Sequence, residues 1–348
     1  TVTGVQTCAL PISEIRKNWY DAIATNAYGY DPKTLTTKPI IFRDKDDAKN
    51  YPLHTKSYTE NAFASFYANG SYTLMRRYTL GASVRMDGSD LFGVDKKYRY
   101  LPIYSVSGLW RISDEPFLRT TKNWMDNLAL RLSYGLQGNI DKNTSPYLIG
   151  DYKNETILNN EETSISISGA PNDKLRWEKT ASYNIGVDFS ILKSAINMSV
   201  DYYYRKGTDL IGIKNLPLEN GFESMTINWA SMENKGVEIN LQTRNITTRN
   251  FSWYTTFNFA YNYNKVLKDL TASNSLTPGL EGSPVGAIFA IKSEVDPETG
   301  RILIYPKGSN EAVDVETLFD MKDEWGIGYY SYNEDAEFRR NLYEYAGT

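Results

Sequence analysis

The sequence predicts an all-β protein: an antiparallel up-and-down transmembrane β-barrel, of which this chain holds only a part. Three observations predict it. Apolar and polar residues alternate along several segments, and these segments are longer than most strands of soluble proteins. The connections between them are alternately short and long. We therefore expect an incomplete barrel that forms an open, curved sheet.

The alternation has a period of two residues, as in a β-strand. In the segment 78–87, Leu80 and Val84 belong to one face, and Ser83 and Arg85 belong to the other. The same alternation is found in residues 128–135, 182–191, 196–205 and 251–264. Such strands suit a barrel wall that separates lipid from a wet lumen.

The alternating segments are also long. The pattern persists through residues 251–264, whereas strands of soluble proteins usually have about 5 or 6 residues. A tilted strand needs about 9 to 11 residues to cross a bilayer. Length and alternation together favour membrane-spanning strands over a soluble sheet with irregular loops.

The connections between the segments differ in length. Tight connections are expected near residues 73–77, 192–194 and 247–250, and longer polar ones near residues 88–99, 139–176, 207–230 and 268–283. Outer-membrane barrels have short periplasmic turns and long extracellular loops. One connection on the short side, residues 113–126, is longer and has the composition of a short amphipathic helix.

Composition narrows the function classes. The 348 residues include 38 basic and 42 acidic residues, for a formal net charge of −4, so no strongly basic face for nucleic acid is expected. The 27 tyrosines fit aromatic girdles at the membrane interfaces, although all-β proteins favour aromatics in general. The sequence contains no run of about 18 apolar residues, so no transmembrane helix is predicted.

We divide the chain into four parts. Residues 1–13 (TVTGVQTCALPIS) look like the translation of a sequencing-adapter oligonucleotide, and we exclude them from the fold prediction. Residues 14–60 are expected to be an extracellular loop region, and residues 61–305 a partial barrel domain. Residues 306–348 are expected to be a loop and a truncated end.

No catalytic or metal-binding arrangement can be recognised. The one histidine, His54, follows Tyr-Pro-Leu in an expected loop, and no partners for a Ser/His/Asp relay can be identified. The one cysteine is Cys8, and no His, Cys, Asp or Glu residues have the spacing of a zinc site. The segment from Asp296 to Gly300 lacks the repeated acidic positions of a calcium loop and predicts a plain turn. We therefore expect no enzyme activity and no metal or cofactor.

Seven blocks resemble the barrel of SusC/RagA-family TonB-linked outer-membrane proteins, and they follow the family's order. Two examples are RRYTLGASVRMDGSDLFG (76–93) and MENKGVEINLQTRNI (232–246). The others are residues 102–118, 127–139, 175–192, 196–211 and 284–302. Together the blocks cover about residues 60–305, and their order makes the resemblance specific.

The resemblance implies a barrel of about 22 strands with an N-terminal plug. It implies a place in the outer membrane of a Gram-negative, Bacteroidetes-like cell, in contact with outer-membrane lipid. It also implies import of oligosaccharides or peptides, with a SusD-like surface lipoprotein as a lid and energy from the TonB complex. The sequence shows no plug, TonB box, signal peptide or terminal aromatic strand, so we expect a fragment that does not transport alone.

Three other interpretations remain open. One is a TonB-dependent siderophore or vitamin receptor. Another, from a different class, is a secreted β-rich adhesin or carbohydrate-binding protein, which would need two sheets packed face to face. An outer-membrane hydrolase is the third, and the missing catalytic set speaks against it.

Candidate site residues come from the polar strand faces and from the long loops. The charged candidates, which would contact substrate or plug, are Arg85, Arg131, Asp188, Asp201, Arg205 and Glu238. Their alternative role is to solvate the lumen wall and pair across strands. The aromatic candidates for stacking on sugar rings are Tyr147, Tyr152, Trp177 and Trp229, which in the alternative are interface anchors.

Overall fold

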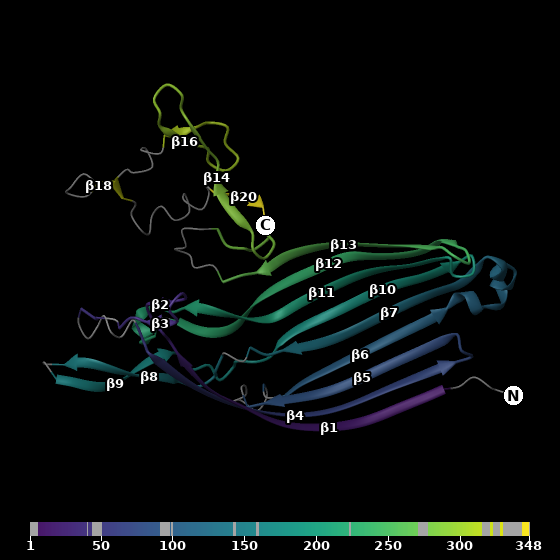
Figure 1. Ribbon diagram of the computed structural model, residues 1–348, viewed down its shortest axis with the longest axis horizontal. Coiled ribbons are helices and arrows are strands. Elements are labelled where there is room, and N and C mark those ends of the chain that lie inside the picture. The colour runs from purple at the N-terminus through teal and green to yellow at the C-terminus, as the bar shows by residue number, and fades with distance from the viewer. Residues whose placement is uncertain are drawn as a thin grey trace.

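The main body of the protein is one nine-stranded antiparallel sheet (Figure 1). The computed structural model describes residues 6–39, 41–43, 51–90, 98, 100–141, 144–157, 160–222, 224–270, 278–314, 321–322, 328–329 and 343–347. The strand order is β1-β4-β5-β6-β7-β10-β11-β12-β13, so each strand pairs with the next long strand of the chain. This is the expected open up-and-down sheet, and the fold prediction is confirmed.

The sheet consists of β1 (Gln6–Thr25), β4 (His54–Leu74), β5 (Tyr78–Ser89), β6 (Tyr100–Arg111), β7 (Met125–Asn139), β10 (Glu178–Ile191), β11 (Ile196–Asn215), β12 (Ser224–Thr247) and β13 (Ser252–Lys268). Its shortest strands, β5 and β6, have 12 residues, and its longest, β12, has 24. Every strand therefore meets the length of about 9 to 11 residues that a bilayer requires.

The remaining elements are short. They are β2 (Tyr30–Asp31), β3 (Thr36–Thr37), β8 (Ile149–Ile157), β9 (Asn160–Gly169), β14 (Ile288–Ile291), β15 (Ser293–Val295), β16 (Ile302–Ile304), β17 (Val313–Asp314), β18 (Met321–Lys322), β19 (Gly328–Tyr329), β20 (Tyr343–Gly347) and the 3-10 helices η1 (Ile112–Asp114), η2 (Pro116–Asn123) and η3 (Leu218–Asn220). No helix in the described part of the chain is long and apolar enough to span a membrane.

The two ends of the sheet differ. Three tight turns and the connection with η1 and η2 gather at one end, and the β2–β3 and β8–β9 hairpins lie at the other (Figure 1). We call the first end the short-turn rim and define it as residues 75–77, 111–126, 192–195 and 244–251. The connection expected to hold a short helix contains η1 and η2.

Glu115 fastens η1 and η2 to the neighbouring turn. Its carboxylate accepts hydrogen bonds from Arg77 Nη1 at 2.6 Å, from Trp110 Nε1 at 3.0 Å and from the Tyr78 hydroxyl. The hydrogen bonds from Tyr78 and Trp110, together with the charge of Arg77, lower the pKa of Glu115 below its usual range. Glu115 is only 5% exposed, so this carboxylate has exchanged water for protein partners.

The register of the sheet separates an apolar face from a polar one. Leu132, Ile185, Tyr202, Val237 and Tyr261 are successive partners across five strands, and all but Val237 are 45–59% exposed. Rows of exposed apolar side chains are what a lipid-facing barrel surface requires. The other described sheets have only two or three strands, which disfavours the sandwich of an adhesin.

Tyrosines form a row on this apolar face. The rings of Tyr104, Tyr134, Tyr183 and Tyr204 lie 5.9, 4.6 and 6.1 Å apart in succession. The row crosses four neighbouring strands, β6, β7, β10 and β11. Aromatic rows of this kind are common in outer-membrane barrels, and the assignment of the tyrosines to an interface girdle stays a prediction.

Two expectations about loops are wrong. Residues 14–25 and 54–60 are strand rather than loop, because β1 and β4 pair along their whole length. Lys17 and Asp21 interrupt the apolar pattern of β1, but Lys17 Nζ lies 2.7 Å from Glu60 and Lys56 Nζ 3.7 Å from Asp21 across the strands. Most of residues 207–230 is also strand, since β11 and β12 continue past bulges near Gly207 and Leu210.

The structure at the two ends of the chain departs from the predicted division at residues 13 and 305. Residues 6–13 continue β1 and pair with residues 66–73, while the adapter origin of residues 1–13 stays a prediction. Near the C-terminus, Tyr343 of β20 pairs with Ile291 of β14. The described residues after 305 otherwise form only short ladders.

Candidate functional site

An ion-pair cluster lies on the polar face, where three neighbouring strands each contribute one residue. Arg131 of β7 donates from Nε and Nη2 to the two carboxylate oxygens of Asp188 of β10, at 2.8 and 2.9 Å. The same Nη2 lies 3.0 Å from the carboxylate of Asp201 of β11. A two-pronged bond of this kind fixes both position and orientation of the guanidinium.

Gly186 makes room for the Arg131 cluster. It is the register partner of both Arg131 and Asp201, so it lies directly beneath the guanidinium. A Cβ atom on Gly186 would lie 2.3 Å from Asp201 Oδ1 and 2.8 Å from Arg131 Cζ. The glycine therefore leaves the space that the ends of the Asp201 and Arg131 side chains occupy.

A hollow of about 340 Å³ borders the cluster. Besides Arg131 and Asp201, its polar lining consists of Ser71, Thr79, Ser107, Ser133 and Asn184. Asn184 Nδ2 donates to Ser133 Oγ at 3.2 Å. Tyr203, the register partner of Asn184 on β11, donates to Asn262 Oδ1 at 2.9 Å. The polar groups of this wall are thus mainly hydroxyl and amide groups, which suit a neutral, hydrogen-bonding solute.

Glu238 adds a carboxylate to this region. It is the register partner of Asp201, so two like charges stand directly opposite each other on β11 and β12. Glu238 is exposed and forms no hydrogen bond or ion pair with any residue that the structure describes. Like charges in this position cost stability in a sheet, and the free carboxylate remains available to a solute or to another segment.

The other charged candidates lie apart from the cluster. Arg85 Nε lies 2.5 Å from Asp87 Oδ1, and its guanidinium carbon lies 5.0 Å from the centre of the Tyr67 ring. Arg205 is exposed and lies 4.8 Å above the Tyr203 ring. The structure therefore brings together three of the six charged candidates, with Glu238 adjacent.

The aromatic candidates differ in accessibility. Trp177 is 8% exposed and packs with Leu101 and Leu175, which leaves little of its face for a ligand. Trp229 is 42% exposed, with Lys268 Nζ 3.5 Å from its ring centre. Tyr147 is 56% exposed, and the side chain of Tyr152 lies outside the described residues.

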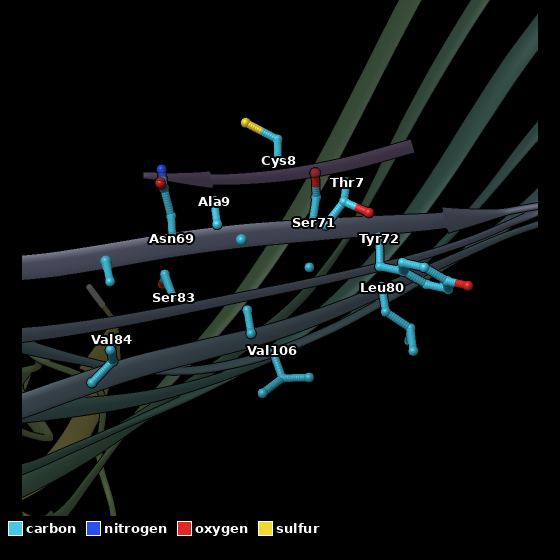
Figure 2. Close-up of a pocket in the computed structure, with 14 residues that line it drawn as sticks. Thr7, Cys8, Ala9, Asn69, Ser71, Tyr72, Leu80, Ser83, Val84 and Val106 are labelled. Carbon is cyan, nitrogen blue, oxygen red and sulfur yellow. The ribbon is translucent and has the colours of Figure 1, made fainter. Parts of the chain in front are cut away.

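A larger hollow, of about 660 Å³, lies at the edge of the sheet among β1, β4, β5 and β6 (Figure 2). Its lining includes Ala9, Ala82, Val84 and Val106 and contains no charged side chain. One wall comes from residues 7–9, which belong to the segment excluded from the fold prediction. Polar residues such as Thr7, Asn69 and Ser83 also line it, but Leu80, Val84 and Val106 place it on the apolar face of the sheet, so we do not take it as a candidate site for a polar ligand. Within the described residues, no group of three or more His, Cys, Asp or Glu could hold a metal ion.

The polar row beside the cluster was missed by sequence reasoning. This row consists of register partners on four strands: Ser107, Ser133, Asn184 and Tyr203. Each lies two residues along its strand from a member of the row that contains Arg131, Gly186 and Asp201. The sequence pattern already placed Ser133, Asn184 and Tyr203 on the polar faces of their own segments. Small polar residues are so common on polar strand faces that parity alone did not single them out.

Comparison with known proteins decides the family. The family model described as "TonB dependent receptor-like, beta-barrel" matches residues 12–345. The chain belongs to this family. The TonB-dependent receptor P39 of Formosa agariphila is 32% identical over 303 residues, which are 84% of this chain and 27% of that protein. The TonB-dependent receptor SusC of Bacteroides thetaiotaomicron is 32% identical over 223 residues, 60% of this chain and 21% of its own length.

A solved structure of the RagAB peptide importer matches 98% of this chain and 36% of its own, with a TM-score of 0.72 and 24% identity. At that identity the match shows the shared fold. Together with the SusC relative it confirms the SusC/RagA resemblance, and the TonB-dependent receptor family places this barrel segment in the outer membrane. The family match extends to residue 345, beyond the boundary at 305 drawn from the sequence. This chain spans 27% and 29% of the length of the first two relatives.

Proposed function

We propose that this chain forms part of the wall of a TonB-dependent outer-membrane importer for oligosaccharides or peptides. The observation that carries the proposal is the polar face around the Arg131 cluster. Hydroxyl, amide and charged side chains line a hollow there, on the face opposite the tyrosine row. A solute rich in hydrogen-bonding groups would find matching donors and acceptors along this wall.

Oligosaccharide is our first choice of substrate class, because five of the seven polar side chains that line the hollow carry neutral hydroxyl or amide groups. Peptide is the second choice, since peptide groups use the same hydrogen bonds and the RagAB structure is described as a peptide importer. A siderophore or vitamin receptor is the remaining alternative within the family. We assign the chain no catalytic step.

We also propose two partners. A SusD-like surface lipoprotein would cover the end of the sheet that carries the long connections. The TonB complex would act from the opposite end, through parts of the protein outside this chain. Within the wall, Arg131, Asp201 and Glu238 would contact either the substrate or the plug.

The test is uptake by cells that express the complete gene. A strain with the gene deleted should regain uptake of labelled oligosaccharides when the gene is restored, and should lose it again when TonB is removed. Peptide uptake in their place would select the second substrate class. Uptake that continues without TonB would contradict the proposed function.

Glu238→Gln tests the wall itself. Because Glu238 has no partner in the described structure, the variant should fold normally and insert in the membrane. Loss of one charge-assisted hydrogen bond to a solute should lower uptake about ten-fold or more. Lys206→Gln, exposed on the opposite face of the neighbouring strand β11, is the matched control and should leave uptake unchanged. Equal uptake by both variants would remove Glu238 from the proposed contact surface.

A further inference from the structure

The short-turn rim carries an excess of positive charge. It contains eight Lys and Arg residues and three Asp and Glu residues, whereas the whole chain has a net charge of −4. Arg77 is paired with Glu115. The exposed cations without an ion pair to any described residue are Arg76, Arg111, Lys193, Arg244 and Arg249.

Four of these cations are held in two pairs. Arg111 Nη1 donates to the backbone oxygen of Arg76 at 3.3 Å, and Arg244 Nη2 donates to the backbone oxygen of Lys193 at 2.9 Å. Each contact brings a second positive side chain to a turn that already has one. Asp126 lies near the second pair, where it accepts the backbone N–H of Ser194 at 2.9 Å. Since neither cation of the first pair has an ion pair with a described residue, an anion from outside would relieve their repulsion.

The turn tips use residues that turn geometry does not favour. Met75 and Arg76 have φ of 53° and 59°, and Leu192 and Lys193 both have φ of 56°. Glycine or asparagine adopts this left-handed conformation more readily. Both tips nevertheless consist of an apolar residue followed by a cation, which indicates that the side chains matter.

Apolar side chains are exposed beside the cations. Met75 and Leu192 are 57% and 54% exposed, and Phe117 and Trp124 in the η2 region are 66% and 47% exposed. Apolar side chains next to long cationic ones are typical of surfaces that lie between acyl chains and headgroups.

We propose that the short-turn rim binds anionic phospholipid headgroups of the periplasmic leaflet. Short turns of outer-membrane barrels face the periplasm, so these side chains meet phospholipid there. The guanidinium groups would bind phosphate oxygens, while Met75, Leu192 and Trp124 would lie against the acyl chains. The inference uses the position of the barrel in the membrane and is independent of the transported substrate.

The experiment titrates phospholipid onto the complete protein purified in detergent, with bound lipid counted by native mass spectrometry. Phosphatidylglycerol should bind more tightly than phosphatidylcholine, and added salt should reduce the difference. The variant R76Q/K193Q/R244Q should weaken phosphatidylglycerol binding on the order of 100-fold, at about five-fold per cation. The variant K33Q/K174Q/K214Q removes the same charge from exposed positions away from this rim and should bind as the unaltered protein does.

A second variant separates lipid binding from folding. R76G/K193G removes two cations and also relieves the left-handed backbone, so it should unfold at the same or a higher temperature while binding phosphatidylglycerol about 25-fold more weakly. Inorganic phosphate at the same concentration should not displace the lipid, because it lacks the acyl chains. Unchanged lipid affinity in the rim variants, or an equal loss in the control variant, would overturn the proposal.

Discussion

Gly186→Ala should break the Arg131 cluster while changing the chain by a single methyl group. The new Cβ would lie 2.3 Å from Asp201 Oδ1 and 2.8 Å from Arg131 Cζ, so the end of at least one of these side chains has to move, and we expect the ion pairs to lengthen. Forced displacement in a packed site costs about 1–3 kcal/mol. Since the Arg131 side chain is 40% exposed, water compensates part of the lost attraction, and we expect the lower half of that range.

The matched control is Gly108→Ala on β6. There the nearest atom to a new Cβ is Leu80 Cδ2 at 4.0 Å, an ordinary contact. Both substitutions remove the same backbone freedom of a strand glycine, so the difference between them isolates the clash. Denaturant unfolding of the complete protein in detergent, followed by tryptophan fluorescence, measures that difference. Equal midpoints for the two variants would mean that the Arg131 guanidinium does not lie over Gly186, and would refute the reasoning.

The described contacts support three further predictions. Leu175→Ala should destabilise the protein by about 2–5 kcal/mol, measured by the same unfolding assay, because Leu175 is fully buried. Gly236→Ala should destabilise more than Gly186→Ala, because its Cβ would lie 2.4 Å from a backbone oxygen that cannot rotate away. Glu115 has a lowered pKa, so its stabilisation is present above the ordinary carboxyl pKa of about 4.3 and is lost as pH falls below that value. Proteolysis at η2 should therefore accelerate on acidification, and Glu115→Gln should remove this pH dependence.

Much of the sheet could be predicted from the sequence because lipid and lumen impose a strict alternation on each strand. The segments around Leu80, Leu132, Ile185 and Phe259 keep that alternation, and each is a strand of the main sheet. The pattern failed in β1, where Lys17 occupies a position of apolar parity. Its partner Glu60 lies on β4, so the pairing that tolerates Lys17 is invisible in either segment alone.

The candidate site depends on register, and only part of the register can be read from a sequence. The tight turn after Ile191 fixes the pairing of β10 with β11, so the position of Asp201 opposite Gly186 follows from the turn. Arg131 reaches Gly186 across the connection 140–177, whose length leaves the offset between β7 and β10 free.

Even a tight turn does not always suffice. Between β12 and β13 the register shifts by one residue near Arg244, only a few residues from the turn at residues 248–251. An extrapolation from that turn would set Asn262 opposite the wrong residue of β12 rather than opposite Gly236. A one-residue error moves every side chain to the opposite face. Residue types and parity therefore identified the charged candidates one by one, whereas their grouping into one cluster required the pairing of whole strands.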